Sequence, residues 1–218
     1  VSDKGCKEIF KRMRQRGVAD GPSSLYSLVS ALHLASADVG KEGMAALQEL
    51  LMSQMCILTS LDLSSTAIDG WALIQALRGN ATVTSLDVRR VPGIASMFEA
   101  VGDLLLQEGG ICRIGYMRCD AYDILEGDKV ISLRERVIGQ GAAKLLAGLL
   151  KHNDSIVDLD LTATDLEKVS VEAIAAVFAF NEALTVLRLT FNPQLDGEAK
   201  AALTAAAEKW KPTLRLEL

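Results

Sequence analysis

The side chains best suited to chemistry in this sequence are arginines and aspartates that lie inside or just after short apolar triplets. The middle residue is charged in Leu61-Asp62-Leu63, Leu86-Asp87-Val88, Leu159-Asp160-Leu161 and Leu187-Arg188-Leu189. In a strand, that middle residue points away from the face that its two apolar neighbours share. We therefore predict a partner-binding face formed by these residues together with nearby arginines and apolar side chains: Asp62, Asp87, Arg89, Arg90, Arg113, Met117, Arg118, Arg134, Asp160, Arg188 and Phe191.

The arginines of this set are predicted to gather into one cluster. Arg89, Arg90, Arg113, Arg118 and Arg134 belong to three successive predicted strands, and neighbouring strands lie about 4.8 Å apart. A guanidinium group is a planar donor that pairs with carboxylates and phosphates. A protein is the favoured partner, with Met117 and Phe191 as exposed apolar anchors. The alternative that stays open is a solvated, charge-balanced sheet face without a partner.

Other kinds of chemistry have weaker support. Gly139-Gln140-Gly141 follows a predicted strand and opens a helix, as phosphate-binding loops do, but the Lys-Ser/Thr pair of a P-loop is absent. The chain has two histidines and no Gly-x-Ser-x-Gly elbow, and no histidine stands near Cys112 and Cys119. We expect no catalytic residue, no metal site and no cofactor, and therefore a protein that is not an enzyme.

The composition limits which classes of partner and which cellular compartment the sequence favours. The 218 residues are 50% hydrophobic with a mean hydropathy of +0.23, which allows a large core. The net charge of −5 argues against nucleic acid as a partner, and no apolar run approaches the ~20 residues that span a bilayer. The four cysteines form no CxxC pair, which favours a reducing compartment. We predict an intracellular, cytoplasmic protein without membrane insertion.

The apolar triplets recur along the chain at a nearly constant interval. Their last apolar residues stand at positions 34, 63, 88, 116, 133, 161 and 189, separated by 29, 25, 28, 17, 28 and 28 residues. A period near 28 is typical of a solenoid with one strand and one helix per unit. An apolar residue follows five positions after the triplet at Val39, Ile68, Ile138 and Leu166, and is predicted to enter the core.

Two further repeat positions carry polar residues with a structural role. Asp69 is predicted to cap the helix that follows it. Asn80, Asn153 and Asn181 each precede a strand leucine by six positions. Although Asn80 and Asn153 lie in glycosylation sequons, this shared phase favours a turn-forming role for all three.

The spacing Leu58-x-x-Leu61-x-Leu63, found again at residues 156–161 and 184–189, resembles the leucine-rich repeat family and its ribonuclease-inhibitor-like class. The resemblance covers roughly residues 25–218, and Cys119 and Asn192 match the Cys or Asn of that class. It implies an α/β fold, a leucine-rich-repeat solenoid (horseshoe) with a concave parallel β-sheet and convex outer helices. It also implies a non-catalytic protein–protein interaction scaffold, with a role as a subunit of a larger assembly as one option. A GTPase-activating protein of the leucine-rich-repeat type and the sensor domain of a multidomain intracellular receptor stay open as alternatives.

The domain boundaries follow from the same pattern. Residues 1–24 are predicted to be an N-terminal helix, from a preceding or capping repeat, and a loop at 17–24. Residues 25–218 are predicted to be the solenoid, with about seven strand units and an irregular loop at 117–129. Only 17 residues separate Tyr116 from Leu133, too few for a strand and a helix, so residues 120–128 with their four carboxylates are predicted to replace a helix.

Overall fold

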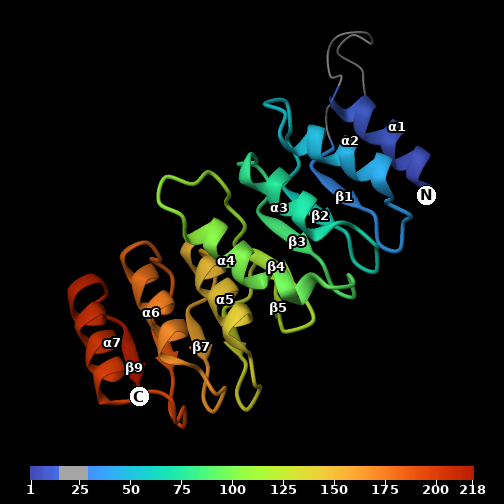
Figure 1. Ribbon diagram of the computed structural model, residues 1–218. Helices are drawn as coiled ribbons and strands as arrows, with labels where there is room; N and C mark the ends of the chain where they lie inside the picture. Colours follow the sequence, from blue (N-terminus) through green and yellow to red (C-terminus); the bar gives the residue numbers. More distant parts are fainter. Residues whose placement is uncertain (15–28) are drawn as a thin grey trace. The chain divides into compact units, whose positions relative to one another are not determined.

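The apolar triplets form short parallel strands, and most segments between them form helices, in a computed structural model that describes residues 1–14 and 29–218 (Figure 1). The predicted loop at 17–24 lies outside the described residues. The chain divides into two compact units. Unit 1 is Val1–Met97 with Gly109–Asp120, and unit 2 is Phe98–Glu108 with Ala121–Leu218.

The described residues of unit 1 form four parallel strands in sequence order. Its elements are α1 (Asp3–Arg14), β1 (Ala31–His33), α2 (Lys41–Leu51), β2 (Ser60–Asp62), α3 (Gly70–Arg78), β3 (Ser85–Asp87), the 3-10 helix η3 (Ile94–Met97) and β4 (Tyr116–Arg118). Leu32 lies opposite Leu61, Leu61 opposite Leu86, and Leu86 opposite Met117. Helix α2 packs against both α1 and α3 along one side of the strands (Figure 1).

Unit 2 repeats this arrangement. Its elements are α4 (Phe98–Leu106), β5 (Asp123–Ile124), β6 (Val130–Ser132), α5 (Gln140–His152), β7 (Asp158–Asp160), α6 (Lys168–Ala176), the 3-10 helix η4 (Val177–Ala179), β8 (Val186–Arg188), α7 (Gly197–Trp210) and β9 (Arg215–Glu217). Strands β6 to β9 are parallel, with Ile131, Leu159, Leu187 and Leu216 in register. Helix α5 packs between α4 and α6.

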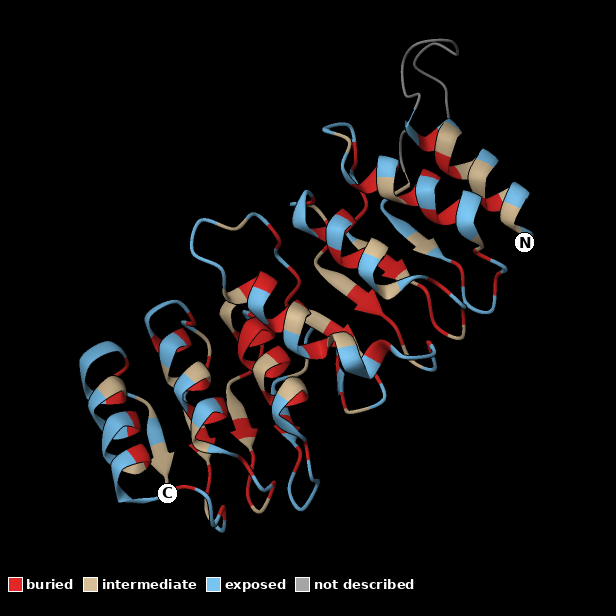
Figure 2. Ribbon diagram, viewed as in Figure 1, coloured by how far each residue is buried: buried red, intermediate tan, exposed pale blue. Residues whose placement is uncertain are grey.

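The core lies between helices and strands, and most of it is aliphatic. Each helix has a buried side and an exposed side (Figure 2), as expected for an amphipathic helix on a sheet. The four residues predicted to enter the core five positions after a triplet are all buried: Val39, Ile68, Ile138 and Leu166. This prediction is confirmed, and so is the repeat of strand and helix within each unit.

The polar repeat positions also take the predicted roles. Asp69 caps α3, because its Oδ1 accepts hydrogen bonds from the backbone N–H groups of Trp71 (2.9 Å) and Ala72 (3.2 Å). Asn80 is buried and its Oδ1 accepts from Val83 N at 2.8 Å, while its Nδ2 donates to Leu51 O at 2.8 Å. Asn153 and Asn181 are likewise buried and bonded to the backbone. Their amides therefore hold the turn before each strand.

The turns after the strands share one backbone conformation. Six residues, each two positions after a triplet, have φ between 55° and 60°: Ser36, Ser65 and Arg90 in unit 1, and Glu135, Ala163 and Phe191 in unit 2. Four of them donate their N–H to the carbonyl of the neighbouring turn at 2.8–3.0 Å. The left-handed conformation is thus a requirement of the repeat, because it directs this N–H at the next turn.

The predicted register of the fourth strand was wrong. The triplet Ile114-Gly115-Tyr116 was expected to be the strand, but β4 is Tyr116–Arg118 and Met117 lies opposite Leu86. The reason is packing: Ile114 is fully buried, as is Val83 before β3, whereas Ile111 is exposed. Residue 114 therefore takes the position expected for residue 111, and the strand shifts with it.

Between β4 and β6 the chain contains no helix in residues 119–129, all of which the structure describes, and only the two-residue strand β5. Tyr122 and Ile124 bury their side chains there, and the Tyr122 hydroxyl donates to Ala142 O at 2.9 Å. The observed architecture is α/β with parallel sheets. The horseshoe curvature and the ribonuclease-inhibitor-like class remain predictions.

Candidate partner-binding surface

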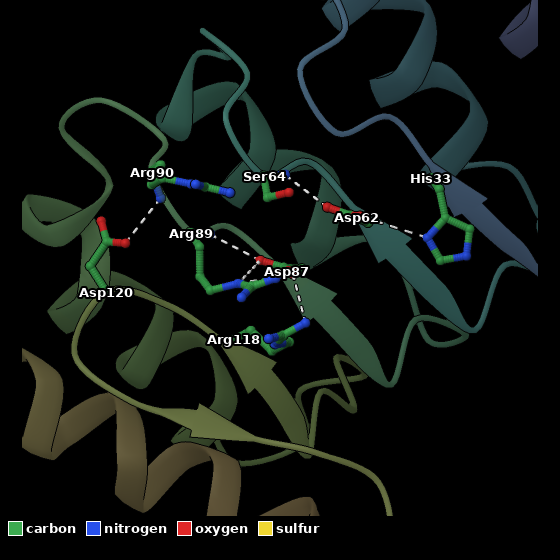
Figure 3. Close-up of polar contacts among 8 residues, drawn as sticks. All are labelled: His33, Asp62, Ser64, Asp87, Arg89, Arg90, Arg118 and Asp120. Atoms are coloured by element: carbon green, nitrogen blue, oxygen red, sulfur yellow. Dashed lines mark hydrogen bonds and ion pairs between the residues drawn. The ribbon is translucent and has the colours of Figure 1, made fainter.

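One face of the unit 1 sheet carries a row of ionisable side chains, which we call the open face. His33, Asp62, Asp87 and Arg118 lie in register on β1 to β4 (Figure 3). His33 Nδ1 is 3.7 Å from Asp62 Oδ2, and Arg118 Nη1 is 3.7 Å from Asp87 Oδ2. The row thus consists of two neighbouring pairs, each with one carboxylate.

Asp87 is the centre of this surface because two arginines share it. Arg89 Nε donates to both carboxylate oxygens at 3.0 and 3.1 Å, and Arg89 Nη2 donates to Oδ2 at 2.7 Å. The Asp87 side chain is 11% exposed, whereas those of Arg89 and Arg118 are 30% and 36% exposed. The carboxylate is therefore the inner group, and the two guanidinium groups cover it.

The electrostatics of Asp87 follow from this burial. Loss of hydration on burial would raise the pKa of its carboxyl, but the Arg89 guanidinium and N–H bonds and the Arg118 charge outweigh it and hold the pKa below its usual range. A carboxylate that is stabilised in this way is a weak proton acceptor. The arrangement can hold a charged surface in place and is poorly suited to acid–base catalysis.

The strand aspartates also have a structural role that the sequence analysis missed. Asp62 Oδ1 accepts from Ser64 N at 2.9 Å, Asp87 Oδ1 from Arg89 N at 3.1 Å, and Asp160 Oδ1 from Thr162 N at 2.9 Å. Aspartate side chains commonly accept such a hydrogen bond from the backbone N–H two residues further along the chain, in an Asx-turn. The signal that marks them is an aspartate between the two apolar residues that end a strand.

Arg90 takes part through its backbone. Its φ is 57°, and its N–H donates to Asp120 Oδ1 at 3.0 Å (Figure 3). Its side chain is exposed beside the pair formed by Arg89 and Asp87. Arg90 is therefore held at its Cα while its guanidinium extends into solvent.

Two of the predicted site residues lie elsewhere than expected. Met117 is only 2% exposed, because the register of β4 turns it into the core opposite Leu86, so its prediction as an exposed anchor is wrong. Arg113 lies before β4, and its Nη1 donates to Gly110 O at 2.7 Å and Cys112 O at 3.2 Å. It bonds to the backbone of its own loop instead of joining Arg89 and Arg118 at Asp87.

The remaining predicted residues belong to unit 2. Arg188 Nη2 donates to Asp158 Oδ2 at 3.1 Å, and its Nε lies 3.4 Å from Glu217 Oε2. The hydrogen bond to Asp158 raises the pKa of the Arg188 guanidinium. Arg134 Nε pairs with Glu135 Oε1 at 3.2 Å. Whether Arg134 completes a cluster with the arginines of unit 1 stays a prediction.

Asp160 in unit 2 resembles Asp87 in its chemistry. Burial would raise the pKa of its carboxyl, but hydrogen bonds from Thr162 and the charges of Arg134 and Arg188 lower it below the usual value. Phe191 is 79% exposed, as predicted for an apolar anchor. Unit 2 thus carries its own charged sheet residues, and the exposed ring of Phe191 stands at the turn after β8.

The structure also bears on metal sites and on membrane-spanning helices. Among residues 1–14 and 29–218, no three His, Cys, Asp or Glu side chains come together in a way that would hold a metal ion. Within the same ranges, no helix combines the length and the apolar character that crossing a membrane would need.

In the acidic loop at residues 120–128, Asp128 Oδ2 accepts a hydrogen bond from Leu125 N at 2.8 Å, so this carboxylate closes a turn.

Comparisons with known proteins give a distant likeness in structure only. No protein-family model and no curated protein matches the chain. Among solved structures, leiomodin-1 actin-binding site 2 is 14% identical, with 96% of this chain and 76% of that chain covered and a TM-score of 0.33. The tropomodulin C-terminal domain of Caenorhabditis elegans is 15% identical, with 94% and 92% covered and a TM-score of 0.36. At these scores the likeness carries no conclusion about function.

Proposed function

We propose that this chain is a non-catalytic protein-interaction scaffold of the leucine-rich-repeat kind, and that unit 1 binds a protein partner through its open face. The observation that carries the proposal is the register of His33, Asp62, Asp87 and Arg118 across four strands, on the face opposite the buried leucines. A parallel sheet with both faces covered has apolar residues on both. Here one face is apolar and the other charged, so the charged face is available to a partner.

The chemistry of the open face defines the partner. Asp87 holds Arg89 by hydrogen bonds and attracts Arg118 in an ion pair at 3.7 Å, which reduces the entropy that a partner must remove when it binds them. A planar guanidinium held in place is suited to a carboxylate in a two-bond arrangement. We therefore propose a partner that presents one carboxylate to Arg118, a second carboxylate to the solvent-exposed guanidinium of Arg90, and a basic group to Asp62.

The test must separate binding from folding, and the contacts of Asp87 decide which arginines to change. A charge-reversing substitution of Arg89 by glutamate would place a second carboxylate beside Asp87 and disturb the sheet. Arg90→Glu with Arg118→Gln leaves the hydrogen bonds between Arg89 and Asp87 in place, because glutamine adds no negative charge beside Asp87. It also keeps the Arg90 backbone N–H that donates to Asp120. The matched control is Lys11→Glu with Arg12→Gln, which makes the same change of net charge on α1.

The measurement is capture from an extract of the source cells on beads that carry the wild-type chain, followed by isothermal titration calorimetry with the purified captured protein. We expect the Arg90/Arg118 double variant to bind about 10-fold to 100-fold more weakly at unchanged circular dichroism, while the α1 variant binds like wild type. Equal affinity of all three chains would remove the open face as the binding surface. Equal loss in both variants would show a charge effect without a specific surface.

A further inference from the structure

Phe191 in unit 2 is poorly suited to its position in two independent respects. Its ring is 79% exposed, and its backbone has φ of 58°. The equivalent turn residues elsewhere are Ser36, Ser65, Arg90, Glu135 and Ala163. The repeat therefore requires the left-handed conformation here, and a bulky aromatic residue is among the least favourable choices for it.

The side chain of the next residue, Asn192, stabilises this turn. Asn192 is buried, and its Nδ2 donates to Leu161 O and Leu189 O, each at 2.8 Å, while its Oδ1 accepts from Leu166 N at 3.0 Å. The carbonyl of the preceding residue, Thr190, accepts a hydrogen bond from Ala163 N at 3.0 Å. None of these bonds uses the Phe191 ring, so the fold does not account for an aromatic side chain at this position.

The ring borders a hollow of about 530 Å³ whose other lining residues are Asn192, Pro193, Leu195 and Lys200. Within the described part of the chain the Lys200 ammonium forms no ion pair and no side-chain hydrogen bond. An exposed aromatic ring beside an unpaired cation defines a small surface with an apolar centre and a positive rim. Its complement is an apolar pocket with a carboxylate at its edge.

We propose that Phe191 and Lys200 form a second docking site, at which the Phe191 ring inserts into an apolar pocket of a partner protein and Lys200 pairs with a carboxylate at the rim of that pocket. The site lies wholly within unit 2 and does not depend on the open face of unit 1. Interface hot spots are typically a few anchor side chains that fill well-packed, desolvated pockets of the partner.

The proposal predicts opposite effects of one substitution on stability and on binding. Asparagine accepts the left-handed conformation and a polar environment, so Phe191→Asn should raise the melting temperature by about 2–4 °C. The same change removes the ring and should weaken partner binding about 30-fold. Ala163→Gly is the matched backbone control, because Ala163 has φ of 55° in the adjacent turn. It should raise the melting temperature and leave binding unchanged.

The partner is found by placing the photocrosslinking residue p-benzoylphenylalanine at position 191 of the full chain in an extract of the source cells. The control position is Val137, which is equally exposed at 79%. A protein that crosslinks at 191 and not at 137 is purified, and its dissociation constant is measured by calorimetry for wild type, Phe191→Asn, Ala163→Gly and Lys200→Glu. We expect Lys200→Glu to bind about 10-fold more weakly.

Several outcomes would overturn the proposal. They are the absence of a crosslink specific to position 191, a Phe191→Asn dissociation constant within twofold of wild type, and a lowered melting temperature for Phe191→Asn, which would assign the ring to the fold. A crosslink to a second copy of this chain would contradict the stated occupant. Because Arg90→Glu with Arg118→Gln leaves this site intact, failure here is distinguishable from failure of the open face.

Discussion

Asp120 Oδ1 accepts a hydrogen bond from the backbone N–H of Arg90 at 3.0 Å, where the two preceding turns of unit 1 use a backbone carbonyl. Ser36 N donates to Ser64 O at 2.9 Å, and Ser65 N donates to Arg89 O at 2.8 Å. Asp120 holds the same turn position as Ser64 and Arg89, but its side chain, and not its backbone carbonyl, is the acceptor. The Asp120 carboxylate therefore extends the hydrogen-bonded series of turns to the point where the regular repeat stops.

This relationship predicts that Asp120→Ala destabilises the chain by about 1–2 kcal/mol, because the Arg90 N–H loses a charged acceptor while its left-handed conformation stays. Asp120→Asn retains an acceptor oxygen and should lose less than half as much. The measurement is the free energy of unfolding from urea titration. Equal stability of the alanine and asparagine variants would contradict the role of this oxygen.

Asp87 predicts how stability depends on pH. Because its pKa in the folded chain lies below the usual 3.8, its contribution is fully present above that value and is lost as pH falls through the lower, folded value. At pH 6, Asp87→Asn should be less stable than wild type by about 1–3 kcal/mol, since Arg89 and Arg118 lose their shared carboxylate.

The two proteins should converge as pH falls below the usual 3.8 and through the lower pKa of the folded chain, because the wild-type carboxyl becomes protonated there. Urea titrations at intervals of one pH unit follow this difference. A constant difference between wild type and Asp87→Asn over the whole range would show that the carboxylate charge does not contribute to folding.

The sequence pattern was a sound guide to the strands and a poor guide to what their charged side chains contact. Leu61 lies opposite Leu86 in unit 1 and Leu159 lies opposite Leu187 in unit 2, as the period predicts, because burial fixes which residues face the core. The fourth strand was misplaced since Met117-Arg118-Cys119 is also an apolar triplet, and the choice between the two depends on the length of the loop before it.

The arginines illustrate why the site was harder to predict. Arg89, Arg113 and Arg118 have the same side chain, yet Arg89 hydrogen-bonds to Asp87, Arg118 only pairs with its charge at 3.7 Å, and Arg113 donates to the carbonyls of its own loop. Strand period gives the face of a residue but not the partner of a long, flexible side chain. Sequence alone therefore predicted a charged face, and three-dimensional contacts were needed to find its centre.

Helices α4 and α5 in unit 2 approach closely at two glycines. A Cβ atom at Gly102 would lie 2.8 Å from the backbone C of Lys144, and one at Gly148 would lie 2.8 Å from Leu105 Cβ. Gly102→Ala and Gly148→Ala should each destabilise the chain by about 1–3 kcal/mol, because the helices must separate.

The matched control is Gly197→Ala at the start of α7, where a Cβ would meet no atom within 4 Å. Alanine favours helix over glycine, so this variant should be as stable as wild type or slightly more stable. Urea titration of the three variants tests the packing. Gains of stability at Gly102 or Gly148 comparable to that at Gly197 would contradict the close approach.

Lys151 on α5 closes the end of α4. Its Nζ donates to Leu105 O, Leu106 O and Gln107 O at 3.2, 3.1 and 3.2 Å. The last carbonyls of a helix lack partners within the helix, and a cation is favourable near them. Lys151→Met keeps the apolar stem and removes the charge and donors, so it should cost about 1–2 kcal/mol of unfolding free energy.

Hydrogen exchange locates this effect, because amides in the last turn of α4 should exchange faster in Lys151→Met while those of α7 do not. Lys168→Met is the control: it removes an exposed ion pair with Glu198 (2.7 Å) and should leave stability nearly unchanged. If both lysine variants lose the same stability, the loss reflects net charge and not the carbonyls of α4. If only Lys151→Met is destabilised and exchange quickens at α4, the lysine holds this helix end in place.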